Sequence, residues 1–417
     1  MNEEELLVNY NLMEDLKPKN MPDEIKIWDE TLRDGEQTPG VALTIEEKIK
    51  IAQLMDEIGI HIIDAGFPAV AESEKKVVKS LAKEGFKNSS LLASARTVRG
   101  DIEACVECDV DEIATFIAAS DLHIKYKLKM SREEVIERAV DSIEYAKEHG
   151  VVVNFVTEDS TRSDLGYLTR LYKAAEEAGA DRVVISDTVG FARPAVIKHI
   201  ISHLRENLSI PLSIHCHNDF GLATANTLAG IEEGVSVPHT CVNGYGERAG
   251  NAPLEEVVMA LEILYGYNTG IQTERLYELS KIVEEAFLVP LAIHKPIVGE
   301  NAFSHEAGIH VHGVLAHALT YEPIPPEMVG RTRAFFLGKH TGAAIVEHKL
   351  KEKGITAPKE KLIEIVQRIK FSAETKSKEE LKKTIKEAQE AIKKARGGIT
   401  EDEFWKIVEE VLGIKIK

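Results

Sequence analysis

Two histidines set two residues apart are the strongest chemical signal in this chain of 417 residues. His215 and His217 stand in the run Ser-Ile-His-Cys-His-Asn-Asp, which is typical of a β-strand, so both imidazoles point to one face. Paired imidazoles in such a place are metal ligands more often than core residues. With Asp34 they make two histidines and one carboxylate, which leaves coordination positions open for a substrate. These ligands suit Mn²⁺, Mg²⁺, Zn²⁺ or Co²⁺ without distinguishing among them.

The segment around Asp34 carries further polar groups. Arg33 precedes it and Gln37 follows it, just past the first expected strand. A carboxylate beside a guanidinium is able to hold a metal and polarise a substrate oxygen. A loop held by a salt bridge would contain the same residues, and the segment alone does not separate the two interpretations.

Other candidate groups follow later expected strands. Glu158 is a candidate acid or base, and the Thr188 hydroxyl is able to bind a carboxylate. The glycine-rich run 243–251 permits close backbone approach to a ligand. Within it, Glu247 is a candidate outer carboxylate and Asn251 a candidate further ligand, although an ordinary glycine-rich turn is the alternative interpretation.

A histidine-rich segment lies beyond these strands. His305 and His310 have the spacing HExxxH, which differs from the HExxH of zinc proteases and would put the two rings about 140° apart on a helix. This spacing excludes a protease site of that kind. One of these histidines is a candidate general base near neutral pH, and Tyr321 is a further polar group nearby.

Short β-rich runs alternate with amphipathic helices along the part of the chain that carries most of these groups. The expected strands span residues 25–29, 60–65, 90–95, 112–117, 151–157, 182–186, 212–217 and 238–242. Two helices begin at capping boxes, Thr44 with Glu47 and Ser131 with Glu134, and a helix near 253–265 follows the last strand.

This alternation predicts the fold class α/β. Helices that return the chain after each strand make the strands parallel, and eight strand–helix units at roughly thirty-residue spacing are the count of a (β/α)₈ TIM barrel. A doubly wound open sheet is the alternative, but it usually has fewer units and a GxGxxG turn after the first strand, which is absent here.

The expected domains follow from where the alternation of strands and helices begins and ends. Residues 1–24 form an N-terminal extension, 25–290 the TIM-barrel catalytic domain, 291–350 a linker or subdomain, and 351–417 a mostly helical C-terminal subdomain. Within the last of these, the Lys/Glu-rich stretch 376–396 is expected to be a solvated helix stabilised by i,i+4 pairs.

Composition excludes several classes of protein. The chain carries 51 Lys+Arg against 69 Asp+Glu, a formal charge of −18, which disfavours general binding to nucleic acid or to anionic membranes. No apolar run approaches the length of a membrane span, and the acidic N-terminus does not resemble a secretory signal. The four cysteines are too few for a disulfide scaffold, and the single CxxC of Cys105 and Cys108 lacks a second pair for zinc. We therefore expect a cytoplasmic location.

Five segments together resemble one enzyme family. They read TLRDGEQTPGV, HCHNDFG, NGYGERAGNA, HEAGIH and LGKHTG, in this order within residues 25–350. The chain is thereby similar to the metal-dependent TIM-barrel acyl-CoA:2-oxo-acid synthases, which include homocitrate, 2-isopropylmalate, citramalate and Re-type citrate synthases.

The resemblance implies roles for particular residues. Asp34, His215 and His217 would bind the divalent metal with Asn251 close by, and Arg33 would stabilise the oxyanion of the 2-oxo group. The other implied roles are substrate contact for Gln37, carboxylate binding for Thr188, and acid–base catalysis for Glu158, His310 and Tyr321. It also implies a homodimer in which His310 and Tyr321 serve the neighbouring subunit's site.

The implied reaction is a condensation of acetyl-CoA with a 2-oxo acid, followed by hydrolysis of the thioester. About 67 residues follow Leu350, too few for the regulatory domain of leucine-type synthases, which favours homocitrate synthase or Re-type citrate synthase; of the two we expect homocitrate synthase acting on 2-oxoglutarate. Methanogen-type homocitrate synthases resemble the chain best, including the segment 123–127. The chain departs from lysine-pathway homocitrate synthases at Asn154, where those usually carry an Arg for the distal carboxylate, and at Val156. Arg96 is the candidate substitute cation, and the alternative is that no cation takes this place.

Three other classes are weighed against a synthase. Retro-aldol lyases such as hydroxymethylglutaryl-CoA lyase share the metal barrel, but the NGYGERAGNA loop and the long segment after the barrel favour a synthase. A biotin-dependent carboxyltransferase would not need HEAGIH, and a non-catalytic sensor would not need Glu158, His310 and Tyr321 together.

Overall fold

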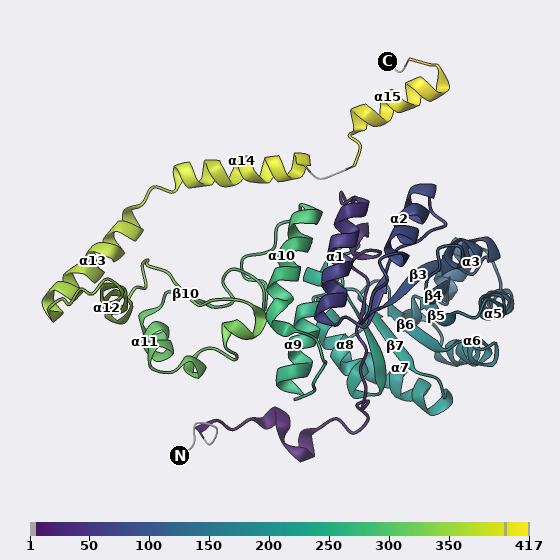
Figure 1. The fold of residues 1–417 in the computed structure, drawn as a ribbon, viewed down its shortest axis with the longest axis horizontal. Coiled ribbons are helices and arrows are strands. Elements are labelled where there is room, and N and C mark those ends of the chain that lie inside the picture. The colour runs from purple at the N-terminus through teal and green to yellow at the C-terminus, as the bar shows by residue number, and fades with distance from the viewer. Residues whose placement is uncertain (1–5, 396–397, 416–417) are drawn as a thin grey trace. The chain divides into compact units, whose positions relative to one another are not determined.

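Eight parallel strands close into a barrel in the computed structural model, which describes residues 6–395 and 398–415 (Figure 1). The strands follow one another around the barrel in chain order, and β8 pairs with β1 through Trp28 opposite His239. They are β1 Trp28–Asp29, β2 Ile62–Asp64, β3 Ser90–Arg96, β4 Glu112–Ala118, β5 Val152–Glu158, β6 Arg182–Asp187, β7 Leu212–Cys216 and β8 Val235–Thr240. The predicted (β/α)₈ barrel is confirmed.

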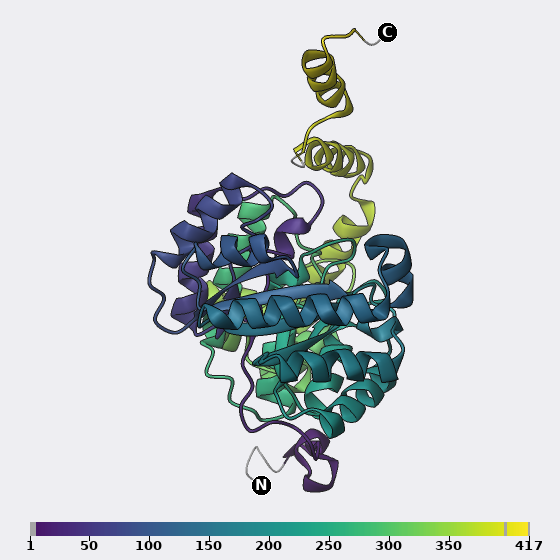
Figure 2. The same ribbon diagram turned by 90° about the vertical axis from the view of Figure 1, so that its right-hand side faces the viewer.

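Helices surround the strands in both views (Figure 1, Figure 2). Their bounds are α1 Ile45–Ile58, α2 Glu72–Ala82, α3 Arg99–Val106, α5 Arg132–Glu148, α6 Leu165–Glu177, α7 Pro194–Asn207, α8 Ala223–Glu232 and α9 Leu254–Leu264. Both predicted capping boxes are present. The Thr44 and Ser131 hydroxyls accept from the third N–H of their helices, and the backbone N–H groups of the same two residues donate to the carboxylates of Glu47 and Glu134. The short α4, Asp121–His123, runs into a π-helical turn at Ile124–Leu128.

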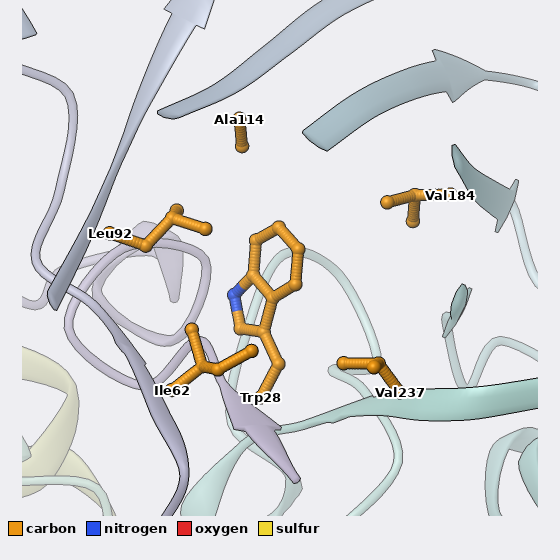
Figure 3. Close-up of a cluster of buried hydrophobic side chains, with 6 residues drawn as sticks. All are labelled: Trp28, Ile62, Leu92, Ala114, Val184 and Val237. Atoms are coloured by element: carbon orange, nitrogen blue, oxygen red, sulfur yellow. The ribbon is translucent and has the colours of Figure 1, made fainter. Parts of the chain in front are cut away.

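One layer of the barrel core is centred on Trp28. Its indole is fully buried and is surrounded by side chains of β2, β3, β4, β6 and β8, namely Ile62, Leu92, Ala114, Val184 and Val237 (Figure 3). Val156 of β5 is half-buried against the same cluster. This apolar layer fills the barrel interior beneath the carboxyl ends of the strands, where the active sites of such barrels lie.

The chain divides into two compact units, Met1–Gln272 with Gly397–Lys417, and Thr273–Arg396. The division between residues 272 and 273 precedes the boundary at residue 290, which was predicted from the end of the strand–helix alternation. The helices of the second unit are α10 Leu276–Phe287, α11 Gly308–Ala316, α12 Ala343–Glu352, α13 Lys359–Thr375 and α14 Glu379–Ala395, and α15 Glu401–Leu412 follows it. Nearly all described side chains of α14 are exposed, as predicted for a solvated helix.

A small sheet interrupts the helices of the second unit. Strands β9 Ser304–His305 and β10 Ala334–Phe335 pair in parallel, within a histidine- and glycine-rich segment where no strand is predicted. Val311, Ile345 and Val346 form one buried cluster of this unit. Across the described part of the chain, no helix is both long and apolar enough to cross a membrane.

Candidate metal and active site

The carboxyl ends of the barrel strands surround a cavity of about 270 Å³. Its apolar lining comprises Trp28, Phe67, Ala114, Phe116 and Val156. Its polar lining comprises Glu30, Arg33, Asp34, Gln37, Ser94, Glu158, Ser186, Thr188, His215, His217, His239, Glu247 and Arg248. Most of the site residues expected in the barrel therefore share one cavity, at the end of a barrel where active sites lie.

The three expected metal ligands come together inside this cavity. Asp34, His215 and His217 are buried and each offers a ligand atom, with these atoms all within 4.8 Å of one another. The Nε2 atoms of the two histidines are 3.1 Å apart. The Asn251 amide nitrogen donates to Asp34, whereas its buried Oδ1 has no hydrogen-bond partner among the described residues. Facing imidazole nitrogens, a carboxylate and an orphaned amide oxygen fit a divalent cation.

The two histidines differ in their electrostatic surroundings. Burial alone would lower the pKa of His215, but the Glu30 carboxylate, whose Oε2 lies 2.7 Å from Nδ1, raises it instead. Burial, followed by the charge of His215, lowers the pKa of His217. His217 is therefore a neutral imidazole at pH 7, the form that binds metal ions.

Arg33 is held beside these ligands by three carboxylates. Its Nη2 lies 2.6 Å from Glu30 Oε1, its Nε 3.0 Å from Asp64 Oδ2 and its Nη1 3.4 Å from Asp34 Oδ1. Burial would raise the pKa of Glu30, but the charges of Arg33, His215 and His239 outweigh it and hold this pKa well below its usual range. Arg33 thus presents a fixed positive charge at the cavity, suited to an oxyanion.

Glu158 lies at the end of β5 and both of its oxygens are 2.7 Å from Lys127 Nζ. The next residue, Asp159, has a left-handed backbone with φ of 63° and is fully buried. Its carboxylate accepts from the Ser120 hydroxyl at 2.5 Å, and its N–H donates to Thr188 Oγ1 at 2.8 Å. Because the Thr188 hydroxyl is the acceptor in this bond, its O–H is able to donate a hydrogen bond to a ligand.

Neither Arg96, the candidate substitute cation, nor Asn154, which stands where an Arg is usual, is among the described residues that line this cavity. Arg96 makes two hydrogen bonds to Asp101, of 2.6 and 3.0 Å, and within the described part of the chain it does not line this cavity. Asn154 is buried and bonds Glu112 at 3.0 Å and Arg182 at 2.6 Å, again away from the lining.

His310 and Tyr321 belong to the second unit. Their rings stack with centroids 4.2 Å apart, so the structure brings this expected pair together. Nearby, Glu322 is buried and accepts from His305 at 3.0 Å and from Arg333. His305 therefore has a structural partner, which leaves His310 as the candidate for acid–base chemistry.

Sequence reasoning missed four residues of the barrel site. Glu30 follows β1 directly and His239 stands near the end of β8. Their positions at strand ends could have identified both as candidate site residues. Arg248 was not chosen as a candidate although it lies in the glycine-rich run 243–251. It pairs with Asp219 at 2.9 Å and lines the cavity. Lys127 was considered only as part of the segment 123–127, which resembles methanogen-type homocitrate synthases.

The comparisons with known proteins assign this barrel. The family model described as HMGL-like matches residues 24–283. The chain belongs to the HMGL-like family. A second model, homocitrate synthase post-HMGL domain-like, matches residues 297–377, so both parts of the chain have counterparts in homocitrate synthases.

Curated relatives cover most of the chain. A homocitrate synthase AksA of Methanocaldococcus jannaschii is 48% identical over 405 residues, 97% of this chain and 93% of the relative. The AksA of Methanopyrus kandleri is 52% identical, covering 86% of this chain and 90% of the relative. A 2-isopropylmalate synthase of M. jannaschii is also 52% identical, over 85% of this chain but 69% of the relative.

The fold of this family member also matches solved structures. An HMG-CoA lyase of Bacillus subtilis aligns with a TM-score of 0.60 at 22% identity, covering 66% of this chain and 97% of the lyase. At this identity the likeness establishes the barrel fold alone.

Proposed function

We propose that the protein condenses acetyl-CoA with a 2-oxo acid, prefers 2-oxoglutarate, and releases homocitrate and CoA. The general activity rests on membership of the HMGL-like family and on relatives named homocitrate, 2-isopropylmalate and citramalate synthases. The choice of 2-oxoglutarate is supported by the AksA of M. jannaschii, which aligns with 97% of this chain over 93% of its own length.

The observation that carries the proposal is the shared cavity. Asp34, His215 and His217 stand beside Arg33, and Glu158 lines the same space. A divalent cation bound by the first three would act as a Lewis acid toward the oxygens of the 2-oxo acid. Mn²⁺, Mg²⁺, Zn²⁺ and Co²⁺ all remain suitable for this ligand set.

The chain's own residues supply the rest of the chemistry. Thr188 donates a hydrogen bond to the substrate carboxylate, and Arg33 stabilises the negative charge that develops on the C2 oxygen. Glu158, with His310 and Tyr321, removes a proton from the acetyl methyl group, whose carbon then bonds to C2. The C2 oxygen takes up a proton, water breaks the thioester C–S bond, and CoA leaves as the thiol.

The apolar lining favours a second candidate substrate. Phe67, Ala114, Phe116 and Val156 give the cavity an apolar wall, and neither Arg96 nor Asn154 is among its described lining residues. The Arg96 guanidinium lies 5.8 Å from the centroid of the Phe67 ring but is paired with Asp101. Such a wall suits the branched side chain of 2-oxoisovalerate, the substrate of a 2-isopropylmalate synthase. Citramalate synthase and Re-type citrate synthase activities use the same chemistry on pyruvate and oxaloacetate.

We also propose a cytoplasmic homodimer in which His310 and Tyr321 complete the partner's barrel site. This arrangement would explain why acid–base candidates occur in a unit separate from the barrel. It rests on the resemblance to the synthases, and the subunit-mixing experiment in the Discussion tests it.

The test is thiol release from acetyl-CoA with 2-oxoglutarate, oxaloacetate, 2-oxoisovalerate and pyruvate, each with and without Mn²⁺. The highest kcat/KM with 2-oxoglutarate would support homocitrate synthase. A preference for 2-oxoisovalerate would replace it by the second candidate, and no metal-stimulated thiol release with any acid would overturn the proposed activity.

A further inference from the structure

One buried carboxylate contacts both the metal-ligand cluster and the candidate oxyanion-binding arginine. Glu30 is 1% exposed. Its Oε2 lies 2.7 Å from His215 Nδ1, and its Oε1 lies 2.6 Å from Arg33 Nη2. The same Oε1 is 3.0 Å from His239 Nδ1, and the His239 ring packs on Trp28 with centroids 3.9 Å apart. Oε1 therefore accepts hydrogen bonds from Arg33 and His239, whereas Oε2 is in close contact with His215 Nδ1 but has no aligned hydrogen bond among the described residues.

The backbone holds Glu30 in this place. Its N–H donates to Thr240 O of β8 at 2.8 Å, which continues the pairing between β1 and β8. Its carbonyl accepts from the Arg33 and Gly35 N–H groups at 3.1 and 2.9 Å, closing the tight turn that carries Arg33 and Asp34. The carboxylate is thus attached to the rigid barrel and to the turn that presents two site residues.

The contact with His215 has a consequence for metal binding. A carboxylate beside Nδ1 favours the tautomer that carries its proton there, which leaves the Nε2 lone pair free. That Nε2 faces His217 at 3.1 Å, in the cluster completed by Asp34. Carboxylates that orient a ligating histidine in this way typically change metal affinity or activity by about 10- to 100-fold.

We infer that Glu30 is a positioning residue that holds His215 in its metal-ligating tautomer and Arg33 at the substrate oxygen, and so couples cation binding to catalysis. The inference rests on the proposed function, because it assigns Glu30 a part in the same site. It also makes a claim about metal affinity that does not depend on which 2-oxo acid is used.

The test compares Glu30→Gln with the wild-type enzyme by calorimetric titration of the metal-stripped proteins with Mn²⁺. We expect the Mn²⁺ Kd to rise about 10-fold or more. At saturating Mn²⁺, kcat should stay reduced because Arg33 has lost one of its three carboxylate partners, while the KM for acetyl-CoA is unchanged. Glu36→Gln is the matched control, since Glu36 pairs with Lys48 in the same segment and should leave the Kd and kcat at wild-type values.

A second measurement needs no substitution at Glu30. In the Zn²⁺-loaded wild-type protein, ¹⁵N-histidine NMR should show His215 coordinated through Nε2 with its proton on Nδ1; a His215→Asn sample identifies the signal. Coordination through Nδ1 would overturn the inference even if Glu30→Gln fails to fold.

The outcomes separate the inference from the proposed function. Equal Mn²⁺ affinity in wild type and Glu30→Gln would sink the role of Glu30 while leaving the synthase activity intact. Weaker Mn²⁺ binding in Glu30→Gln, with no turnover of any 2-oxo acid by the wild type, would support the positioning role and reject the proposed reaction. Failure of the wild type to bind any divalent cation would overturn both.

Discussion

Lys127 Nζ lies at the same distance, 2.7 Å, from both carboxylate oxygens of Glu158. The turn that carries Lys127 is attached to the end of β5 by Ser120, which donates to Asp159. The candidate acid–base residue is therefore oriented by a cation from the neighbouring strand's loop. Because the Lys127 side chain is half exposed, the pair contributes little to stability, and its effect should be on catalysis.

Replacing Lys127 by Met should lower kcat several-fold, because Glu158 would lose the partner that orients it, and should change the free energy of unfolding by less than about 1 kcal/mol. Lys127→Arg should restore part of the loss. Lys125→Met in the same turn is the control, and steady-state kinetics with urea denaturation measures both quantities. Wild-type kcat in Lys127→Met would show that the pair has no part in turnover.

Replacing His215 by Ala should abolish both metal binding and turnover, because a three-residue ligand set would lose one member. Titration calorimetry with Mn²⁺ and thiol release measure the two effects. Cys216→Ala is the matched control, since Cys216 is the neighbouring buried residue on the same strand and is not a member of the cluster. Full activity of His215→Ala in metal-stripped buffer would remove the metal from the mechanism.

Mixing two inactive variants tests whether the site is shared between subunits. His310→Ala and Arg33→Ala should each lose most activity alone. After subunit exchange, mixed dimers should regain up to about a quarter to a half of wild-type activity, because one of their two sites would contain both residues. Exchange is followed by a mass tag on one variant. Dimers that exchange without regaining activity would place both residues in one subunit's site.

The buried carboxyl of Asp29 should make stability depend on pH. Burial raises its pKa from 3.8 to about 7, against hydrogen bonds from Thr31 and Thr240 that lower it. Between these values the folded protein holds a proton that the unfolded chain releases, so this group's contribution to stability is complete below pH 3.8 and is lost as pH rises toward 7. The slope is on the order of 1.4 kcal/mol per pH unit.

Asp29→Asn should remove this component, because an amide does not titrate and keeps an acceptor for the Thr31 N–H. Denaturation of both proteins at pH 5, 6, 7 and 8 measures it: the variant should gain stability relative to wild type as pH rises. Parallel profiles for the two proteins would contradict the assignment of the shifted pKa to Asp29.

Much of the architecture followed from local patterns. Alternating β-rich runs and capped helices predicted eight parallel strands. Such a prediction is possible because the periodicity of a helix or strand depends on residues only a few positions apart. The spacing of His215 and His217 also predicted a shared face, since side chains two apart on a strand point the same way. Asp34 joined them because barrel strands all end on one face.

Contacts between distant segments required the tertiary structure. Closing the barrel puts Glu30 against His215 and His239, a neighbourhood that no local pattern encodes. Strand register likewise determines that Asn154 forms hydrogen bonds with Glu112 and Arg182 below the cavity. At the end of β3, Arg96 bonds to Asp101 instead of entering the cavity lining. Local sequence determines which elements form, whereas closure and register determine which side chains meet, because those contacts depend on residues far apart in the chain.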